Sequence, residues 1–181
     1  MMGKGKEAVA ALIAEENGEA LLLNYVEDVE TIELADSTLE AVRIQRDVQG
    51  NVVLATTRKL PNLRFRLGDL LLETVGTGMS AAGSLDQPLK LVLTGIGFLR
   101  SVRKMATLDI KKEDAEVLIA LFRLTQEEAV VRVDDLLAVL SGDWDEGRVA
   151  RSLEILEMLA CINVEMSGIT LNETIMVQRI A

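Results

Sequence analysis

The residues of this sequence that could do chemistry are mainly charged, and the basic ones gather in its middle. Residues 43–66 contain six basic residues against Asp47 alone, whereas residues 1–40 contain two basic and ten acidic residues. A basic middle can bind an anion, a phosphate backbone or an acidic lipid surface. The candidate contacts for an anion or a nucleic acid are Arg43, Arg46, Arg58, Lys59, Arg64, Arg66, Arg100, Arg103 and Lys104.

Neutralisation of these residues by the acidic ends of the chain, or by a partner subunit, is the alternative explanation of the same pattern. We favour it, because the whole chain carries a formal net charge of −10 and runs of surface charge are usually only solvated. Whether the basic middle is exposed or neutralised is left open at this point.

A glycine pattern raises the question of a nucleotide cofactor. Gly76-Thr77-Gly78-Met79-Ser80-Ala81 matches the dinucleotide-binding pattern G-x-G-x-x-A. That mechanism needs a strand before the glycines, a helix after them and an acidic residue about twenty positions later. No Asp or Glu lies between Asp86 and Asp109, and no repeating β-α pattern follows. We therefore expect no cofactor.

Catalytic and metal-binding residues are not indicated either. The sequence contains no histidine, which is the commonest general base and metal ligand. The acidic pairs Glu127-Glu128 and Asp134-Asp135 have no second cluster at ligand spacing, so we expect them to be solvated rather than to bind a metal. The single cysteine, Cys161, has no neighbouring base or basic cluster and is expected to be an inert core residue. We therefore predict that the protein is not an enzyme.

Composition bounds the class of protein. The chain has 181 residues, of which 49% are hydrophobic and 27% charged, which is typical of a globular protein. Its longest uncharged apolar run, 91–99, is too short to cross a bilayer, and no apolar segment of a signal peptide follows Met1. A lone cysteine suits a reducing compartment. We therefore expect a cytoplasmic protein.

The first hundred residues combine helices with a small sheet. We expect a helix over Glu7–Glu15, a strand over Thr31–Leu34 and a hairpin that pairs Ala41–Arg46 with Val52–Thr57. Residues 20–26 and 41–47 fit helix or strand, and strand is favoured for the second. The predicted sheet is small and antiparallel.

Two helices are expected next, over Leu63–Gly83 and Pro88–Met105. The second has apolar residues on most sides, so we predict a buried helical pair. Insertion of Pro88–Met105 into a membrane surface is a less favoured use, because its glycines and its lack of a polar face suit a helix enclosed by protein.

The last third of the chain reads as helix, short strand, helix, helix and hairpin. Apolar spacing predicts a helix over Glu113–Leu124, and the β-branched residues Val130–Val133 suit a brief strand. A short second helix precedes Gly142, which suits a left-handed cap. Asp143 is expected to cap the third helix. Residues 163–166 and 169–171 then flank Ser167-Gly168 as a hairpin, which Thr174–Val177 can extend.

This order of elements resembles winged helix-turn-helix domains, over about two fifths of the chain and without pointing to one family. The resemblance implies DNA binding through the third helix, in the major groove. The candidate contact face of that helix is Arg148, Arg151, Glu154 and Met158. Residues 111–181 contain seven basic and fourteen acidic residues, and this excess of negative charge repels a polyanion.

The sequence therefore predicts a mainly α protein of the α+β class. We expect an α+β part over residues 1–106 and a winged-helix-like part over residues 107–181. The favoured function is non-catalytic protein–protein interaction or assembly, with self-association or a protein partner. The alternatives are a DNA-binding transcription regulator, or a protein that binds a membrane surface or an anionic ligand through the basic middle.

Overall fold

The computed structural model describes residues 3–35, 45–78, 86–140 and 142–180. One five-stranded sheet has the strand order β1-β4-β7-β3-β2. Its strands are β1 (Val26–Asp28), β2 (Gln45–Arg46), β3 (Val52–Thr56), β4 (Leu63–Arg66) and β7 (Thr174–Arg179). All neighbouring strands are antiparallel except β3 and β7, which are parallel. The sheet is therefore mixed, and the prediction of an antiparallel sheet was wrong in this respect.

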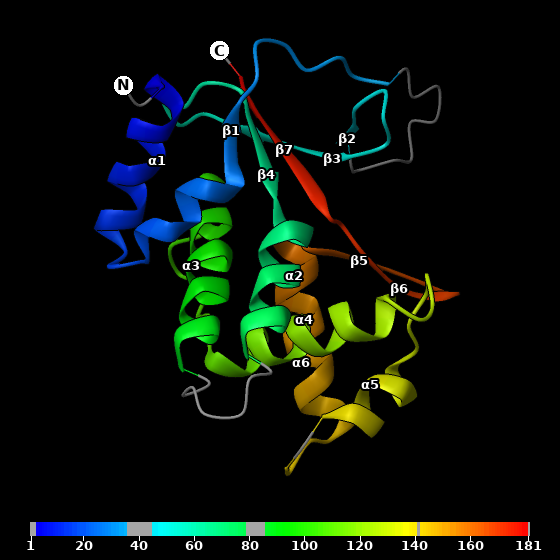
Figure 1. The fold of residues 1–181 in the computed structure, drawn as a ribbon. Coiled ribbons are helices and arrows are strands. Elements are labelled where there is room, and N and C mark those ends of the chain that lie inside the picture. The colour runs from blue at the N-terminus through cyan, green and yellow to red at the C-terminus, as the bar shows by residue number, and fades with distance from the viewer. Residues whose placement is uncertain (1–2, 36–44, 79–85, 141, 181) are drawn as a thin grey trace.

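The helices of the front half lie next to one another beside this sheet (Figure 1). They are α1 (Lys4–Glu15), the short 3-10 helix η1 (Ala20–Tyr25), α2 (Leu67–Gly78) and α3 (Asp86–Val102). The remaining elements are α4 (Lys112–Thr125), α5 (Val133–Val139), α6 (Glu146–Met158), β5 (Ile162–Glu165) and β6 (Gly168–Leu171). The predicted fold class, α+β and mainly α, is confirmed.

The last strand, β7, lies in the centre of the front sheet. It pairs with β3 on one side and β4 on the other, so the prediction that residues 174–177 extend the hairpin was wrong. The consecutive residues Ile175, Met176 and Val177 are all buried, so both faces of this strand are covered here. Figure 1 shows β7 running from the hairpin end of the molecule to the sheet. A division into domains at residue 106 stays a prediction, and this strand crosses it.

The predicted buried helical pair is present, with different bounds. Residues 63–66 form β4 rather than the start of a helix, because Leu63 and Phe65 point into the core while Arg64 and Arg66 point outward. Helix α2 therefore begins at Leu67, and residues 79–83 of the predicted helix lie outside the described part. Val92, Ile96 and Leu99 of α3 are at most 1% exposed, because this helix packs against α1, α2, α4 and η1.

Two smaller expectations differ from the structure. Residues 20–26 fitted helix or strand in the sequence. In the structure residues 20–25 form the 3-10 helix η1, and residue 26 begins β1. Within 31–34 only Leu34 pairs, in an isolated bridge to Asp47. Of the strand expected over 41–46, residues 45 and 46 form β2, and residues 41–44 lie outside the described part.

The predicted winged-helix-like module is built from residues 112–171. Its helices α4, α5 and α6 are followed by the β5–β6 hairpin, and Val131, before α5, bridges to Ile169 of β6. Gly168 permits this close approach, because a Cβ there would lie 2.7 Å from the carbonyl oxygen of Val131. Asp145 caps α6 by accepting a hydrogen bond from the Arg148 amide at 2.8 Å. The prediction of Asp143 as this cap was wrong, because the helix begins two residues later.

Candidate functional site

The two arginines on the outer face of α6 are held by carboxylates of α4. The Arg148 guanidinium lies 3.8 Å from Glu113 and stacks over the Trp144 ring at 4.9 Å. The Arg151 guanidinium lies 3.4 Å from Asp114 and also donates to the carbonyl of Asp109. On the predicted contact face, the two arginines are therefore already paired within the chain, and Glu154 and Met158 remain available to contact a ligand.

Asp114 is the buried anchor of this arrangement. Its carboxylate is fully buried and accepts hydrogen bonds from the Ser152 hydroxyl and from the Lys111 amide, each at 2.7 Å. Hydrogen bonds to a buried carboxylate are among the stronger ones in proteins. Asp114 thereby joins the start of α4 to the middle of α6. The sequence signal for it, an acidic residue in the first turn of a helix, did not indicate a tertiary role.

Three basic residues of the chain's middle are neutralised by acidic residues near the N-terminus or close in sequence. Arg64 lies 3.5 Å and Arg66 3.2 Å from Glu27, and Arg66 also lies 2.9 Å from Asp69. Arg100 lies 3.4 Å from Glu16. These pairs are partly exposed, so each contributes little to stability. Their charge is nevertheless satisfied within the chain.

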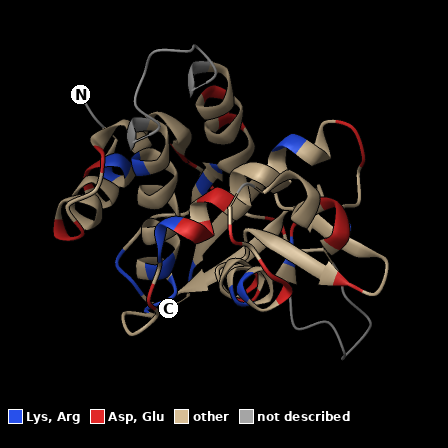
Figure 2. Cartoon of the chain, turned by 90° about the horizontal axis from the view of Figure 1, so that it is seen from below, with Lys and Arg blue, Asp and Glu red and all other residues tan. Residues whose placement is uncertain are grey.

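Four other predicted contact residues gather at the end of α3 without such partners. Within the described ranges, no carboxylate forms an ion pair with any member of this α3-end cluster, which is Arg58, Lys59, Arg103 and Lys104. Two hydrogen bonds bring its halves together. The Thr56 hydroxyl donates to the Val102 carbonyl at 2.9 Å, and Arg58 Nε donates to the Ser101 carbonyl at 3.0 Å. Figure 2 shows Lys and Arg gathered beside the C-terminus.

The remaining basic candidates stand apart from this cluster. Arg46 donates to the Gly50 carbonyl across its own turn, at 2.7 Å, and Arg43 lies outside the described residues. Arg179 was not among the contact residues predicted from the sequence. It is exposed, and it pairs with Thr56 of β3. No local signal could have placed it there, because this pairing joins residues that are far apart in the chain.

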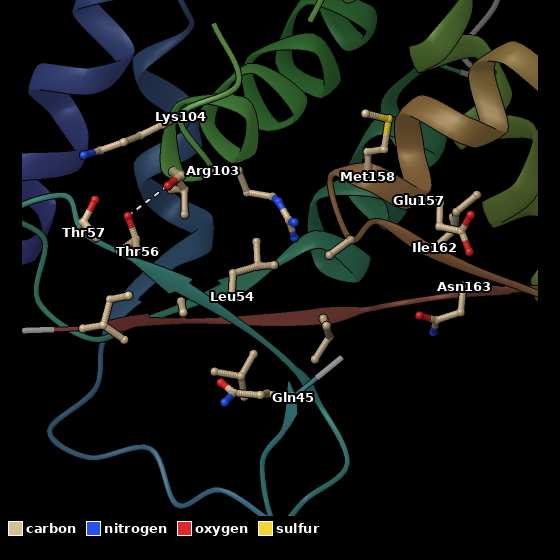
Figure 3. A pocket seen from close by; sticks show the side chains of 16 residues that line it. Gln45, Leu54, Thr56, Thr57, Arg103, Lys104, Glu157, Met158, Ile162 and Asn163 are labelled. Atoms are coloured by element: carbon tan, nitrogen blue, oxygen red, sulfur yellow. Dashed lines mark hydrogen bonds between the residues drawn. The ribbon is translucent and has the colours of Figure 1, made fainter. Parts of the chain in front are cut away.

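An open groove of about 920 Å³ adjoins the α3-end cluster. Its lining residues come from β3, the end of α3, the end of α6 and the start of β5. Figure 3 shows Arg103 extending over Leu54, with Lys104 and Thr57 towards one end of the groove and Glu157 and Asn163 towards the other. Met158 and Ile180, which are both exposed, add apolar surface. The groove therefore has apolar surface, a positively charged end at Lys104 and a negatively charged end at Glu157.

The other sequence candidates do not assemble into a reactive site. Burial raises the pKa of the Cys161 thiol to about 12, so it is protonated at neutral pH. Burial and a hydrogen bond to Glu73 raise the pKa of the Tyr25 hydroxyl to about 12. Gly76 and Gly78 lie in the last turn of α2, so they are preceded directly by a helix, whereas a dinucleotide-binding turn follows directly after a strand. In the described part of the chain, no three Cys, Asp or Glu residues cluster as metal ligands.

None of the described helices is long and apolar enough to cross a bilayer.

Comparison with known proteins gives no counterpart for the groove or for the winged-helix-like module. No protein-family model, curated protein or solved structure matches the chain.

Proposed function

We propose that this chain is a non-catalytic protein-binding protein that uses its winged-helix-like module on a partner protein. The contact surface is the α6–wing surface, which we define as Met158, Val164 and Met166. The single observation that carries the proposal is that both arginines of α6 are bound by α4 carboxylates. A cytoplasmic location belongs to the same proposal, because the free thiol of Cys161 suits a reducing compartment.

The α6–wing surface consists of apolar side chains that the chain leaves exposed. Met158 is 38%, Val164 42% and Met166 fully exposed. Glu157, in the last turn of α6, accepts a hydrogen bond from the Val164 amide at 3.1 Å, so the wing is held against the helix that carries Met158. Methionine adapts its shape to a partner and is common at binding surfaces, and apolar surface favours association with protein.

Charge disfavours duplex DNA as the ligand of this module. DNA-binding proteins neutralise phosphates with free Lys and Arg, whereas Arg148 and Arg151 are already paired. Residues 111–181 carry twice as many acidic as basic residues. The same reasoning does not extend to the α3-end cluster, whose cations form no ion pair with the carboxylates that the structure describes and favour the second candidate function, binding of an anionic ligand.

A crosslinking experiment in the native host tests the proposal. A photoreactive amino acid is placed at Met166 in one variant and at Ala14, an exposed position of α1, in a matched control. The proposal predicts a discrete protein adduct at position 166 that is absent at position 14. An adduct with a second copy of the chain supports the self-associating form of the proposal.

Two results would contradict it. One is a nucleic-acid adduct at position 166. The other is a labelled DNA duplex that binds the purified chain at low salt and loses affinity when Arg148 is changed to Glu. Self-association through α3 is not part of the proposal, because that helix is buried within its own chain.

A further inference from the structure

We propose that the groove beside the α3-end cluster binds an extended acidic segment of a partner protein, with its carboxylates at Arg103 and Lys104. The inference rests on the proposed protein-binding function and deepens it by naming the chemistry of the segment that is recognised. Its occupant is a peptide with acidic residues next to aliphatic ones.

Charge is the first argument. Arg103 and Lys104 are exposed and form no ion pair with any carboxylate in the described ranges, and Figure 3 shows the Arg103 side chain reaching into the groove. In contrast, Arg64, Arg66, Arg100, Arg148 and Arg151 all have carboxylate partners. In a chain with a net charge of −10, cations left without an internal partner are available to an external carboxylate.

Shape is the second argument. The groove is lined by six consecutive residues of the chain, 52–57, and at the rise of a strand this corresponds to a length of roughly 17 Å. A lone phosphate or carboxylate would contact only a small part of such a groove. An extended peptide fills it and brings its side chains to Met158 and Ile180, the exposed large apolar residues that line the groove.

The opposite end of the groove separates a peptide from a nucleic acid. Glu157 lines that end, and its carboxylate is held in place by the hydrogen bond from the Val164 amide. A phosphate backbone carries charge at every nucleotide and would meet this carboxylate. A peptide can place its acidic residues at Arg103 and a neutral residue at Glu157, so the groove also fixes the direction in which the peptide binds.

Backbone strain is the third argument. Lys104 has φ of +54°, in the left-handed region that favours glycine, and it occupies the position where the chain turns out of α3. The Met105 amide there donates to the Arg100 carbonyl at 3.0 Å, which is the capping pattern that usually contains glycine. Strain at a residue whose side chain flanks a groove is an indication of function rather than of stability.

Stabilisation of the negative end of α3 is the competing explanation for these two cations. It predicts that they matter for the stability of the chain and not for a ligand. Lys104→Gln separates the two explanations, because it removes the charge without changing the backbone preference, so the competing explanation predicts a lower melting temperature and unchanged affinity for a ligand.

The test uses the full chain and a library of random linear peptides displayed on phage. Peptides are selected on the immobilised chain, and the best one is labelled and titrated by fluorescence anisotropy. We expect selected sequences in which Asp or Glu adjoins Leu, Ile or Val. Arg103→Gln is expected to weaken binding about tenfold or more, because a hydrogen-bonded ion pair is lost. Lys104→Gln is expected to weaken binding with little change in the melting temperature, and Lys104→Gly is expected to weaken binding while it raises the melting temperature.

Matched variants keep the result interpretable. Asn17 also has a positive φ, of +53°, but does not line the groove, so Asn17→Gly should leave peptide affinity unchanged. Met166→Asp alters the α6–wing surface at a residue that does not line the groove and should also leave peptide affinity unchanged. The inference is overturned by selected sequences without acidic residues, by the absence of binding peptides, or by unchanged affinity of Arg103→Gln. It is also overturned by a labelled DNA duplex that competes with the peptide and depends equally on Arg103.

Failure of this inference and failure of the proposed function have different signatures. If the α6–wing surface alone binds a partner, crosslinking at Met166 gives a protein adduct although no acidic peptide is selected. If the groove alone binds, acidic peptides are selected and depend on Arg103, although position 166 gives no adduct.

Discussion

The outer face of α6 and the end of α3 both present two basic residues, yet the chain treats them differently. Arg148 and Arg151 on α6 lie 3.8 Å and 3.4 Å from carboxylates of α4. Arg103 and Lys104 at the end of α3 have no ion-pair partner among the described residues, and they flank a groove. In the sequence the two pairs look alike. The tertiary partner, rather than the local pattern of charge, decides which of them can contact a ligand.

The difference also runs against what the winged-helix resemblance implies for the third helix. The resemblance implies that this helix contacts DNA. Here its cations serve the packing of α6 on α4, with Asp114 as the buried anchor. The α3-end cluster, for which no ion pair is found among the described residues, belongs to the front half of the chain.

Disruption of the buried face of α3 should have the largest effect, because the helix that carries Arg103 and Lys104 at its end would no longer fold. Ile96→Asp places a carboxylate at a fully buried position of α3 and should unfold the chain, at a cost of several kcal/mol. Lys90→Asp, at an exposed position of the same helix, is the control and should change stability little. Urea unfolding followed by circular dichroism measures both. A folded Ile96→Asp variant with unchanged stability would show that α3 is not enclosed by its own chain.

Disruption of the α6 anchor should have the next largest effect. Asp114→Asn replaces a buried acceptor of three donors, and we expect it to lower the free energy of unfolding by about 2 kcal/mol. Glu113→Gln, the matched change at the partly exposed partner of Arg148, should cost at most about 0.5 kcal/mol. Equal effects in urea unfolding would mean that burial does not distinguish the two carboxylates.

Glycine substitutions at the ends of α3 and α6 should have smaller effects, whose sign depends on whether the replaced residue has a positive φ. Lys104→Gly should stabilise the chain by roughly 0.5–1 kcal/mol, because it relieves a left-handed residue, and Ala160→Gly should do the same at the end of α6. Arg103→Gly, one residue earlier and without positive φ, should instead destabilise. Differential scanning calorimetry gives all three values, and a stabilised Arg103→Gly variant would argue against backbone strain as the cause.

The smallest effect is expected at the packed end of α6. Burial raises the pKa of Cys161 from 9.0 to about 12. The folded chain therefore holds the thiol proton more tightly than the unfolded chain, and stability contributed by this group is present below pH 9 and lost as pH rises from 9 towards 12. At pH 8 we expect no reaction with a thiol reagent in the folded chain and full reaction in urea. Rapid reaction without urea would show that this end of α6 is open.

Elements held together by local sequence could be predicted, and those that depend on distant partners could not. The order of α4, α5, α6 and the hairpin follows from apolar spacing and from Gly142 and Gly168. The position of β7 could not be predicted, because its partners β3 and β4 lie more than a hundred residues away. Strand β4 did carry a signal, the alternation of Leu63-Arg64-Phe65-Arg66, which the long apolar run after it obscured.

The candidate site divides in the same way. All four members of the α3-end cluster were among the basic residues singled out in the sequence. Which basic residues are neutralised depends on Glu16, Glu27 and Asp114, and contacts with these residues arise only when the chain folds. Arg179 could not be found, because it reaches β3 through the sheet.

The most direct test of the central claim compares one basic residue from each region with the same ligand. The acidic peptide selected on the wild-type chain is titrated into Arg103→Gln and into Arg148→Gln, with circular dichroism to verify that both variants are folded. The account predicts that affinity falls about tenfold or more for Arg103→Gln and stays at the wild-type value for Arg148→Gln. Equal losses in the two variants, or a loss confined to Arg148→Gln, would contradict it.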